Sequence, residues 1–238
     1  MQLTAALFRQ SGWWFTTVLI LAVFAFWPRY LSRIAEQPDI RFHIHGLALG
    51  AWCTMLIVQA FLIRTGHRVA HRQLGKLSYF LAPIIALSIL SLVQYRNSVD
   101  ELAGFRLLLL ISILGDVVLY TSTYSLAIVN RRQAQIHARY MVCTGIVVLP
   151  AILDRIFNFY GGLGAAPGEI PLSLILSLVV AEGLLAGLMI WDWKSGNSPA
   201  IFARMLVLFV GVHWFPFVVY DTGLGRVIGT GFMGLPIP

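Results

Sequence analysis

Charged side chains are scarce in this sequence. Asp, Glu, Lys and Arg together make up 11% of the 238 residues, whereas apolar residues make up 58%. A soluble domain is about 25% charged, because its surface needs that many groups to stay hydrated. So few charges argue against a water-soluble protein and indicate a single integral membrane domain that covers residues 1–238.

Cysteines and the common motifs of soluble enzymes are scarce or absent as well. Cys53 and Cys143 each lie in an apolar run without a CxxC partner, which argues against a disulfide framework or a zinc knuckle. The sequence has no Walker loop, GxGxxG or GxSxG motif. Its 17 Lys and Arg residues, against 10 Asp and Glu, lie mainly between the apolar runs, where they meet lipid headgroups. We therefore expect the lipid bilayer as a partner, and no nucleic acid.

Long apolar runs are what the sequence has instead. About 20 apolar residues cross the hydrocarbon core of a bilayer as an α-helix. We therefore predict an all-α fold, a polytopic membrane helix bundle of about seven transmembrane helices. The predicted spans are 12–31, 43–64, 75–95, 106–129, 138–159, 171–193 and 201–220.

The basic residues are divided unevenly between the two ends of these spans. More of the 17 Lys and Arg residues fall in the N-terminal segment and the second, fourth and sixth loops than on the opposite side. Because cytoplasmic loops are enriched in Lys and Arg, we predict a cytoplasmic N-terminus and an external C-terminus.

The histidines lie mostly near the ends of predicted spans. His43 and His45 open the second span, His67 and His71 lie between the second and third, His137 opens the fifth, and His213 lies within the seventh. Because a helix rises about 1.5 Å per residue, His45 and His67 are expected at opposite faces of the membrane. The same rise places His71 and His137 at matching depth.

This distribution favours haem b. Membrane cytochromes of the b type hold haem between helices by axial histidines, often with one haem near each face. By this analogy we expect an inner haem on His71 and His137, and an outer haem on His213 with His45 or His43. The protein would then be an electron-transfer protein or oxidoreductase, with a quinone, another small molecule or another subunit as its redox partner.

A non-haem metal is the alternative for the same histidines. The HxH of His43 and His45 and the HxxxH of His67 and His71 resemble the His-rich boxes of membrane desaturases and hydroxylases, and would bind iron, zinc or copper. Those enzymes gather their ligands at one face. A straight second span keeps the two motifs at opposite faces, so the haem interpretation fits the positions better.

Two carboxylates, Asp116 in the fourth span and Glu182 in the sixth, form a second candidate site with His213. All three are expected near the membrane midplane, the acids at a depth of about 15–17 Å. A charge there costs at least about 2.5–3.5 kcal/mol, so such residues pair, become protonated or serve a function. The site could relay protons, bind a cation or ligate a metal, as in a proton- or cation-coupled carrier. Two protonated carboxyls that hydrogen bond neighbouring helices are the structural alternative, and Gly115 and Gly183 would let helices approach there.

Three segments together resemble a known family. They are Phe42–Gly46 (FHxHG), Ala70–Tyr79 (HRxxGxxxY) and Ile136–Met141 (HxxxM), the last followed by Arg155. Over roughly residues 40–156 they resemble a poorly characterised family of bacterial multi-pass membrane proteins. The resemblance implies a multi-pass protein of the bacterial inner (cytoplasmic) membrane, but it implies no reaction.

Overall fold

The computed structural model describes residues 2–37, 39–97, 102–166, 168–198 and 200–237, and the secondary structure in these ranges is entirely helical. The helices are α1 (Gln2–Phe26), η1 (Leu31–Glu36), α2 (Ile40–Arg64), α3 (Arg68–Gly75), α4 (Ser78–Arg96), α5 (Gly104–Val129), α6 (Ala134–Ile146), α7 (Leu149–Phe159), α8 (Leu172–Lys194), α9 (Ala200–Val219) and α10 (Gly223–Met233). The all-α prediction is confirmed.

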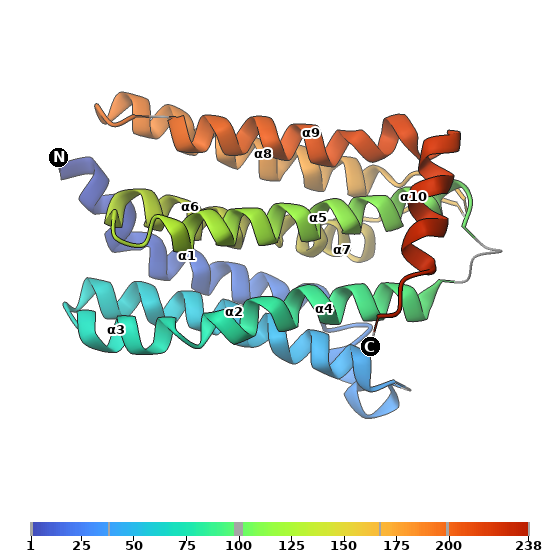
Figure 1. Cartoon of the computed structure of the whole chain (residues 1–238), viewed down its shortest axis with the longest axis horizontal. Helices are drawn as coiled ribbons and strands as arrows, with labels where there is room; N and C mark the ends of the chain where they lie inside the picture. Colours follow the sequence, from blue (N-terminus) through green and yellow to red (C-terminus); the bar gives the residue numbers. More distant parts are fainter. Residues whose placement is uncertain (1, 38, 98–101, 167, 199, 238) are drawn as a thin grey trace.

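Long apolar helices run side by side through the bundle (Figure 1). In the described ranges, six helical stretches are long and apolar enough to cross a membrane: 40–64, 68–96, 104–129, 134–159, 172–194 and 200–219. The first predicted span falls in α1, whose apolar part Gln10–Phe26 packs beside α2. The end of the bundle that carries the N-terminus and α3 is called the N-terminal face below. Which side of the membrane this face meets stays a prediction.

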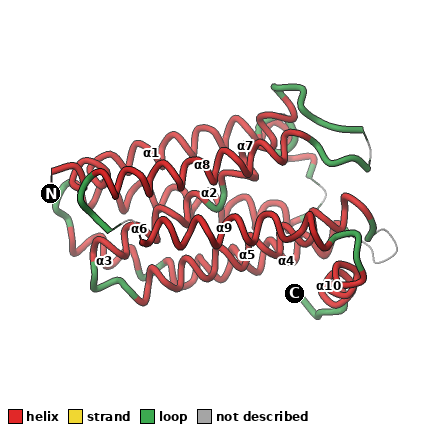
Figure 2. Tube along the Cα trace, turned by 90° about the horizontal axis from the view of Figure 1, so that it is seen from above, coloured by secondary structure: helices red, strands yellow, loops and turns green. Residues whose placement is uncertain are grey.

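The spans close into a ring, and one half-span lies inside it. Each helix of the series α1, α2, α4, α5, α9, α8 and α7 contacts the next, and α7 contacts α1 again. In contrast, α6 packs against α5 and α9 on one side and against α1 and α2 on the other. Figure 2 shows the same bundle from above, with α6 labelled among the long helices. The α6–α7 stretch is accordingly the most buried of the six, with 50% of its apolar 18-residue segment buried, against 28–33% in the other five.

A break between α6 and α7 separates α6, which lies inside the ring, from α7, which is part of the ring. Pro150 lies in the first turn of α7 and has no backbone N–H, so it cannot donate to the carbonyl of Ile146. The helix stops at Ile146 and restarts at Leu149. The single span predicted for 138–159 is therefore two helices, of which α7 packs against α1 and α8.

The ends of the bundle differ from the prediction in two places. The first span was predicted to reach residue 31, but α1 ends at Phe26, because Pro28 disfavours helix at the residue before it. The helix α10 was not predicted, since Gly-rich sequence rarely forms a helix alone. Thr222 caps it by accepting a hydrogen bond from the Gly225 backbone N–H. Figure 1 shows α10 crossing the ends of α5 and α9 at the face opposite the N-terminus.

Candidate functional site

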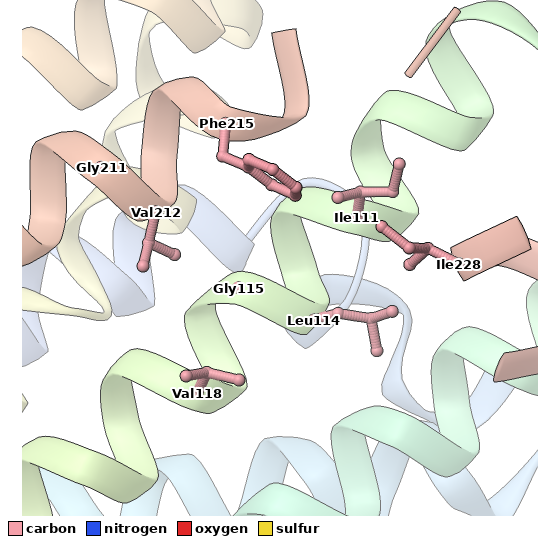
Figure 3. Close-up of a pocket in the computed structure, with 8 residues that line it drawn as sticks. All are labelled: Ile111, Leu114, Gly115, Val118, Gly211, Val212, Phe215 and Ile228. Carbon is pink, nitrogen blue, oxygen red and sulfur yellow. The ribbon is translucent and has the colours of Figure 1, made fainter. Parts of the chain in front are cut away.

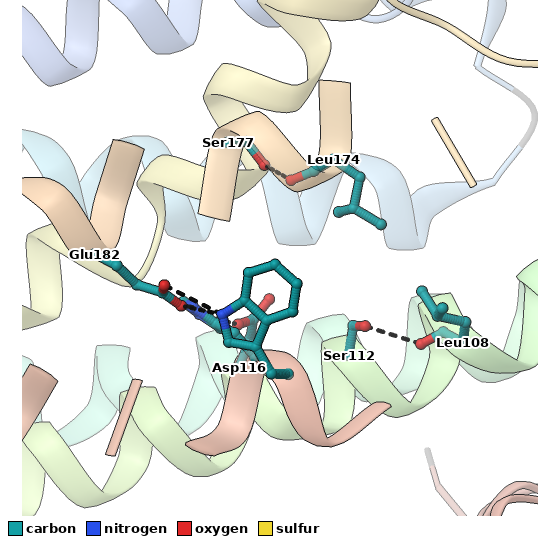
Figure 4. A network of polar contacts seen from close by, with 8 residues as sticks. Leu108, Ser112, Asp116, Leu174, Ser177 and Glu182 are labelled. Carbon is teal, nitrogen blue, oxygen red and sulfur yellow. Dashed lines mark hydrogen bonds and ion pairs between the residues drawn. The ribbon is translucent and has the colours of Figure 1, made fainter. Parts of the chain in front are cut away.

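Three polar side chains from three spans contact one another, and Figure 4 labels two of them, Asp116 and Glu182. Asp116 comes from α5, Glu182 from α8 and His213 from α9. Nδ1 of His213 lies 3.2 Å from Oε1 of Glu182, and Nε2 of His213 lies 3.5 Å from Oδ1 of Asp116. The structure therefore brings together the three residues that depth alone had grouped. They are called the central trio below.

A tryptophan that the sequence reasoning missed completes the site. The indole N–H of Trp214 donates to both carboxylate oxygens of Glu182, at 3.1 and 3.2 Å. The side chains of His213 and Glu182 are 3% and 13% exposed, whereas that of Asp116 is 33% exposed. The only signal in the sequence was that Trp214 directly follows His213.

Incomplete pairing distinguishes the central trio. Its contact between His213 and Glu182 is a hydrogen bond, whereas the contact with Asp116 is an ion-pair contact at 3.5 Å. Nε2 of His213 is thus a buried polar atom without a hydrogen-bond partner among the described residues. Imidazole donates from a protonated ring nitrogen and accepts at an unprotonated one, so His213 can pair with either acid in either protonation state.

Close packing of α5 against α9 positions Asp116 next to His213. A Cβ atom on Gly115 would lie 2.7 Å from Cγ1 of Val212, so only glycine fits beside Asp116. The prediction of a close approach is correct at Gly115 and wrong at Gly183, which is exposed and has open space around it. In α9, Pro216 removes the backbone N–H that would bond Val212, which loosens the helix directly after His213.

A second buried charge cluster lies nearer the N-terminal face. Arg139 of α6 donates to both carboxylate oxygens of Asp192 of α8, at 2.6 and 2.8 Å. The two side chains are 4% and 1% exposed. The sequence reasoning did not pair these two residues, although Arg139 falls inside the predicted span 138–159 and Asp192 inside the predicted span 171–193.

The inner histidine pair is also brought together. The ring centroids of His71 in α3 and His137 in α6 lie 6.4 Å apart, with the ring planes at 81°. Nδ1 of His137 donates to the carbonyl of Ala127 at 2.8 Å, which leaves its Nε2 unprotonated in the neutral ring. Nδ1 of His71 is buried and has no partner in the described part of the chain.

The remaining histidines are placed apart from one another. His45 bonds Ser88 at 3.0 Å, His43 bonds the hydroxyl of Tyr30 at 3.3 Å, and His67 bonds Thr65 at 2.8 Å. No ring contact joins His45 or His43 to His213 in the described ranges, and both ring nitrogens of His213 face carboxyl groups. The described residues contain no group of three His, Cys, Asp or Glu side chains arranged to hold a metal ion.

An apolar groove of about 310 Å³ lies along the contact between α5, α9 and α10 (Figure 3). Its lining comprises Ile111, Leu114, Gly115, Val118, Gly211, Val212, Phe215 and Ile228. Asp116 and His213 do not line it, because they lie on other faces of the same two helices. The groove offers no polar side chain and is therefore separate from the chemistry of the central trio.

No protein-family model, curated protein or solved structure matches this chain. The family resemblance of its three motifs stays a prediction, and the function proposed next is supported by the geometry of the membrane bundle alone.

Proposed function

We propose that this protein is a proton-coupled membrane carrier in which the central trio accepts and releases protons within the membrane. The observation that carries the proposal is the position of His213 between two carboxyl groups from different helices, at 3.2 and 3.5 Å. An imidazole in this position can take a proton from one acid and pass one to the other.

Charge balance in the bilayer supports this role. A net charge at membrane depth is costly, so the trio favours states in which its charges cancel. It is neutral when two of its three groups carry their titratable proton. Several arrangements meet that condition, and they differ only in which of His213, Asp116 and Glu182 lacks a proton. A proton that moves among them also changes which helix, α5 or α8, is ion-paired with α9.

A proton suits this site better than a metal cation does. Cations such as Ca²⁺ need about six to eight oxygen ligands. Here both oxygens of Glu182 accept from the indole N–H of Trp214, and one of them also contacts His213. Hydrogen-bond donors hold the positions where a cation would approach, so the cation-coupled alternative is less well supported.

Proton uptake by proteoliposomes tests the proposal. A potassium diffusion potential drives protons into vesicles that hold a pH-sensitive dye, and the purified protein is compared with its Asp116→Asn and Glu182→Gln variants. We expect each variant to take up protons at least about tenfold more slowly, because the amide keeps the shape but cannot titrate. Asp154→Asn is the matched control, since Asp154 lies in α7 and accepts from Ser173. Parental uptake in both trio variants would contradict the proposal.

A haem-binding redox role is the second candidate, and the inner histidine pair favours it. His71 and His137 face each other from different helices, and the bond from His137 to Ala127 leaves Nε2 free, as in histidines that ligate metals. These two residues would hold one haem b, which would supply one-electron transfer to a quinone or another small redox partner. The predicted outer pair lacks such support, because both nitrogens of His213 face acids.

A visible absorption spectrum of protein from haem-replete cells tests this candidate. Haem ligation predicts a Soret band that His71→Ala and His137→Ala each abolish. A colourless preparation without extractable haem would contradict it, and stoichiometric iron, zinc or copper in that preparation would instead support the non-haem metal enzyme.

A further inference from the structure

Buried polar atoms without a partner are concentrated between the N-terminal face and the central trio. Six side-chain atoms have no hydrogen-bond partner among the described residues: Nε1 of Trp52, Oε1 of Gln59, Nδ1 of His71, the hydroxyl of Tyr120, Oγ1 of Thr123 and Nε2 of His213. The side chains of Trp52, Tyr120, Thr123 and His213 are 0–4% exposed. An unpaired buried polar atom is costly, and buried water is the usual way in which proteins satisfy it.

These atoms form a graded series in depth. His71 lies at the N-terminal face. The rise per residue places the backbones of Gln59 and Thr123 at a depth of about 8–9 Å from that face. Tyr120 follows at about 14 Å, Trp52 at about 18 Å and His213 at about 20 Å. The series therefore spans the distance from the N-terminal face to the central trio.

The helices that carry the series are neighbours. α2 contacts α3 and α4, and α5 contacts α4 and α9, so these elements form one sector of the ring. Across this sector the rings of Trp52 and Tyr120 lie 5.3 Å apart. Toward the N-terminal face, Gln59 donates to the carbonyl of His71. Toward the trio, Tyr120 follows Asp116 by one helical turn on the same face of α5, and its side chain leans back toward it.

The half of the bundle farther from the N-terminal face is different. There the buried serines have hydrogen-bond partners: Ser88 donates to the carbonyl of Ile85, Ser177 donates to that of Leu174, and Ser91 accepts from Nε of Arg41. The buried Ser173 donates to the carboxylate of Asp154, and the half-buried Ser112 donates to the carbonyl of Leu108. Figure 4 shows the bonds of Ser112 and Ser177 together with Asp116 and Glu182. Unpaired polar atoms thus mark only one route away from the trio in the described part of the bundle.

We propose that a file of bound water molecules connects the N-terminal face to the central trio along this series, and that protons reach His213 by it. The inference rests on the proposed function for its role in proton transfer, but the water site itself is defined by the six polar atoms. Waters that bridge hydroxyl, amide and ring-nitrogen groups at successive depths form hydrogen-bonded chains that carry protons. The trio therefore receives its protons from one side of the membrane.

Radiolytic hydroxyl labelling of the intact protein in nanodiscs tests the water site directly. Water bound beside a side chain makes it reactive even where bulk solvent does not reach it. We expect labelling of Trp52 and Tyr120, and none of Phe202, which is equally buried in the apolar core. Trp52 and Tyr120 as unreactive as Phe202 would overturn the water file.

Removal of two hydroxyl groups tests the path. The double variant Tyr120→Phe/Thr123→Val deletes two of the six unpaired atoms at nearly constant shape. We expect its proton uptake in proteoliposomes to fall about tenfold. Thr121→Val/Tyr79→Phe is the matched control, because Thr121 and Tyr79 are exposed residues of α5 and α4. Thermal unfolding of each variant checks that the bundle is intact, and each single variant replaces the double one if it fails to fold.

The outcomes separate the path from the function. Uptake at the parental rate in the path variants, with uptake lost in Asp116→Asn, would overturn the path and leave the proposed function in place. Parental uptake in Asp116→Asn would remove the function, whereas labelling of Trp52 and Tyr120 would then still support bound water.

Discussion

The two buried charge clusters of this bundle differ in how completely they are paired. Arg139 and Asp192 form a bidentate ion pair with distances of 2.6 and 2.8 Å, and both side chains are almost fully buried. In the central trio, His213 lies 3.2 and 3.5 Å from its two acids and keeps one ring nitrogen without a hydrogen bond in the described structure. Both clusters lie in spanning helices, but only one is satisfied by its neighbours.

This difference separates a structural pair from a site that can change state. An arginine stays protonated at any physiological pH, and its fork matches a carboxylate, so the Arg139–Asp192 pair has one stable state that fixes α6 against α8. The trio has three titratable groups and fewer bonds than it has polar atoms, so no single proton arrangement satisfies it. We infer that the Arg139–Asp192 pair stabilises the bundle and that the central trio exchanges protons.

Breaking the ion pair should have the largest effect on stability. Asp192→Ala leaves the Arg139 guanidinium buried without its carboxylate, which costs about 3–5 kcal/mol. We expect little folded protein in detergent, measured by size-exclusion chromatography and thermal unfolding. The double variant Arg139→Met/Asp192→Leu removes both charges and should restore most of the stability. A single variant as stable as the parent would show that the pair does not hold α6.

Widening the contact between α5 and α9 should have the next largest effect. Gly115→Ala places a Cβ atom 2.7 Å from Cγ1 of Val212, and such overpacking costs about 1–3 kcal/mol. It should also separate Asp116 from His213 and slow proton uptake. Gly211→Ala is the control, because nothing lies within 4 Å of its added Cβ. Relief by Val212→Ala in the Gly115→Ala background would confirm the contact, and equal stability of both glycine variants would contradict it.

Removing the indole donor should cost less. Trp214→Phe keeps an aromatic ring but deletes the N–H that donates to both oxygens of Glu182. One hydrogen bond to a charged group contributes about 1.5–3 kcal/mol, and a net change near the lower end is expected because Glu182 can become protonated instead. Thermal unfolding checks this value, with Trp191→Phe, an exposed tryptophan of the same bundle, as the control. A larger loss than that of Asp192→Ala would reverse the ranking of the two clusters.

Replacing the histidine should change stability least and function most. His213→Gln can still hydrogen bond both acids, so we expect a stability change within about 1 kcal/mol of the parent. Because glutamine does not titrate, proton uptake should nevertheless be lost. Retained uptake in a folded His213→Gln variant would show that the histidine only links the acids.

The sequence determined depth along the spans but not position around them. The rise per residue placed Asp116, Glu182 and His213 at one level, and the structure brings them into contact. In a bilayer the lipid-facing side of a helix is as apolar as the packed side, so hydrophobic periodicity does not reveal which helices become neighbours. That is why Trp214 and the Arg139–Asp192 pair were missed, and why pairing His45 with His213 found no support.

Infrared titration of the protein in nanodiscs is the most direct test of the central claim. The carbonyl stretch of a protonated carboxyl is resolved from that of a carboxylate and can be followed across pH. The trio predicts a band that titrates in the parent, is altered in Asp116→Asn and Glu182→Gln, and persists in Asp154→Asn. A spectrum with no titrating carboxyl band, or a band that neither trio variant changes, would contradict the claim that these acids exchange protons within the membrane.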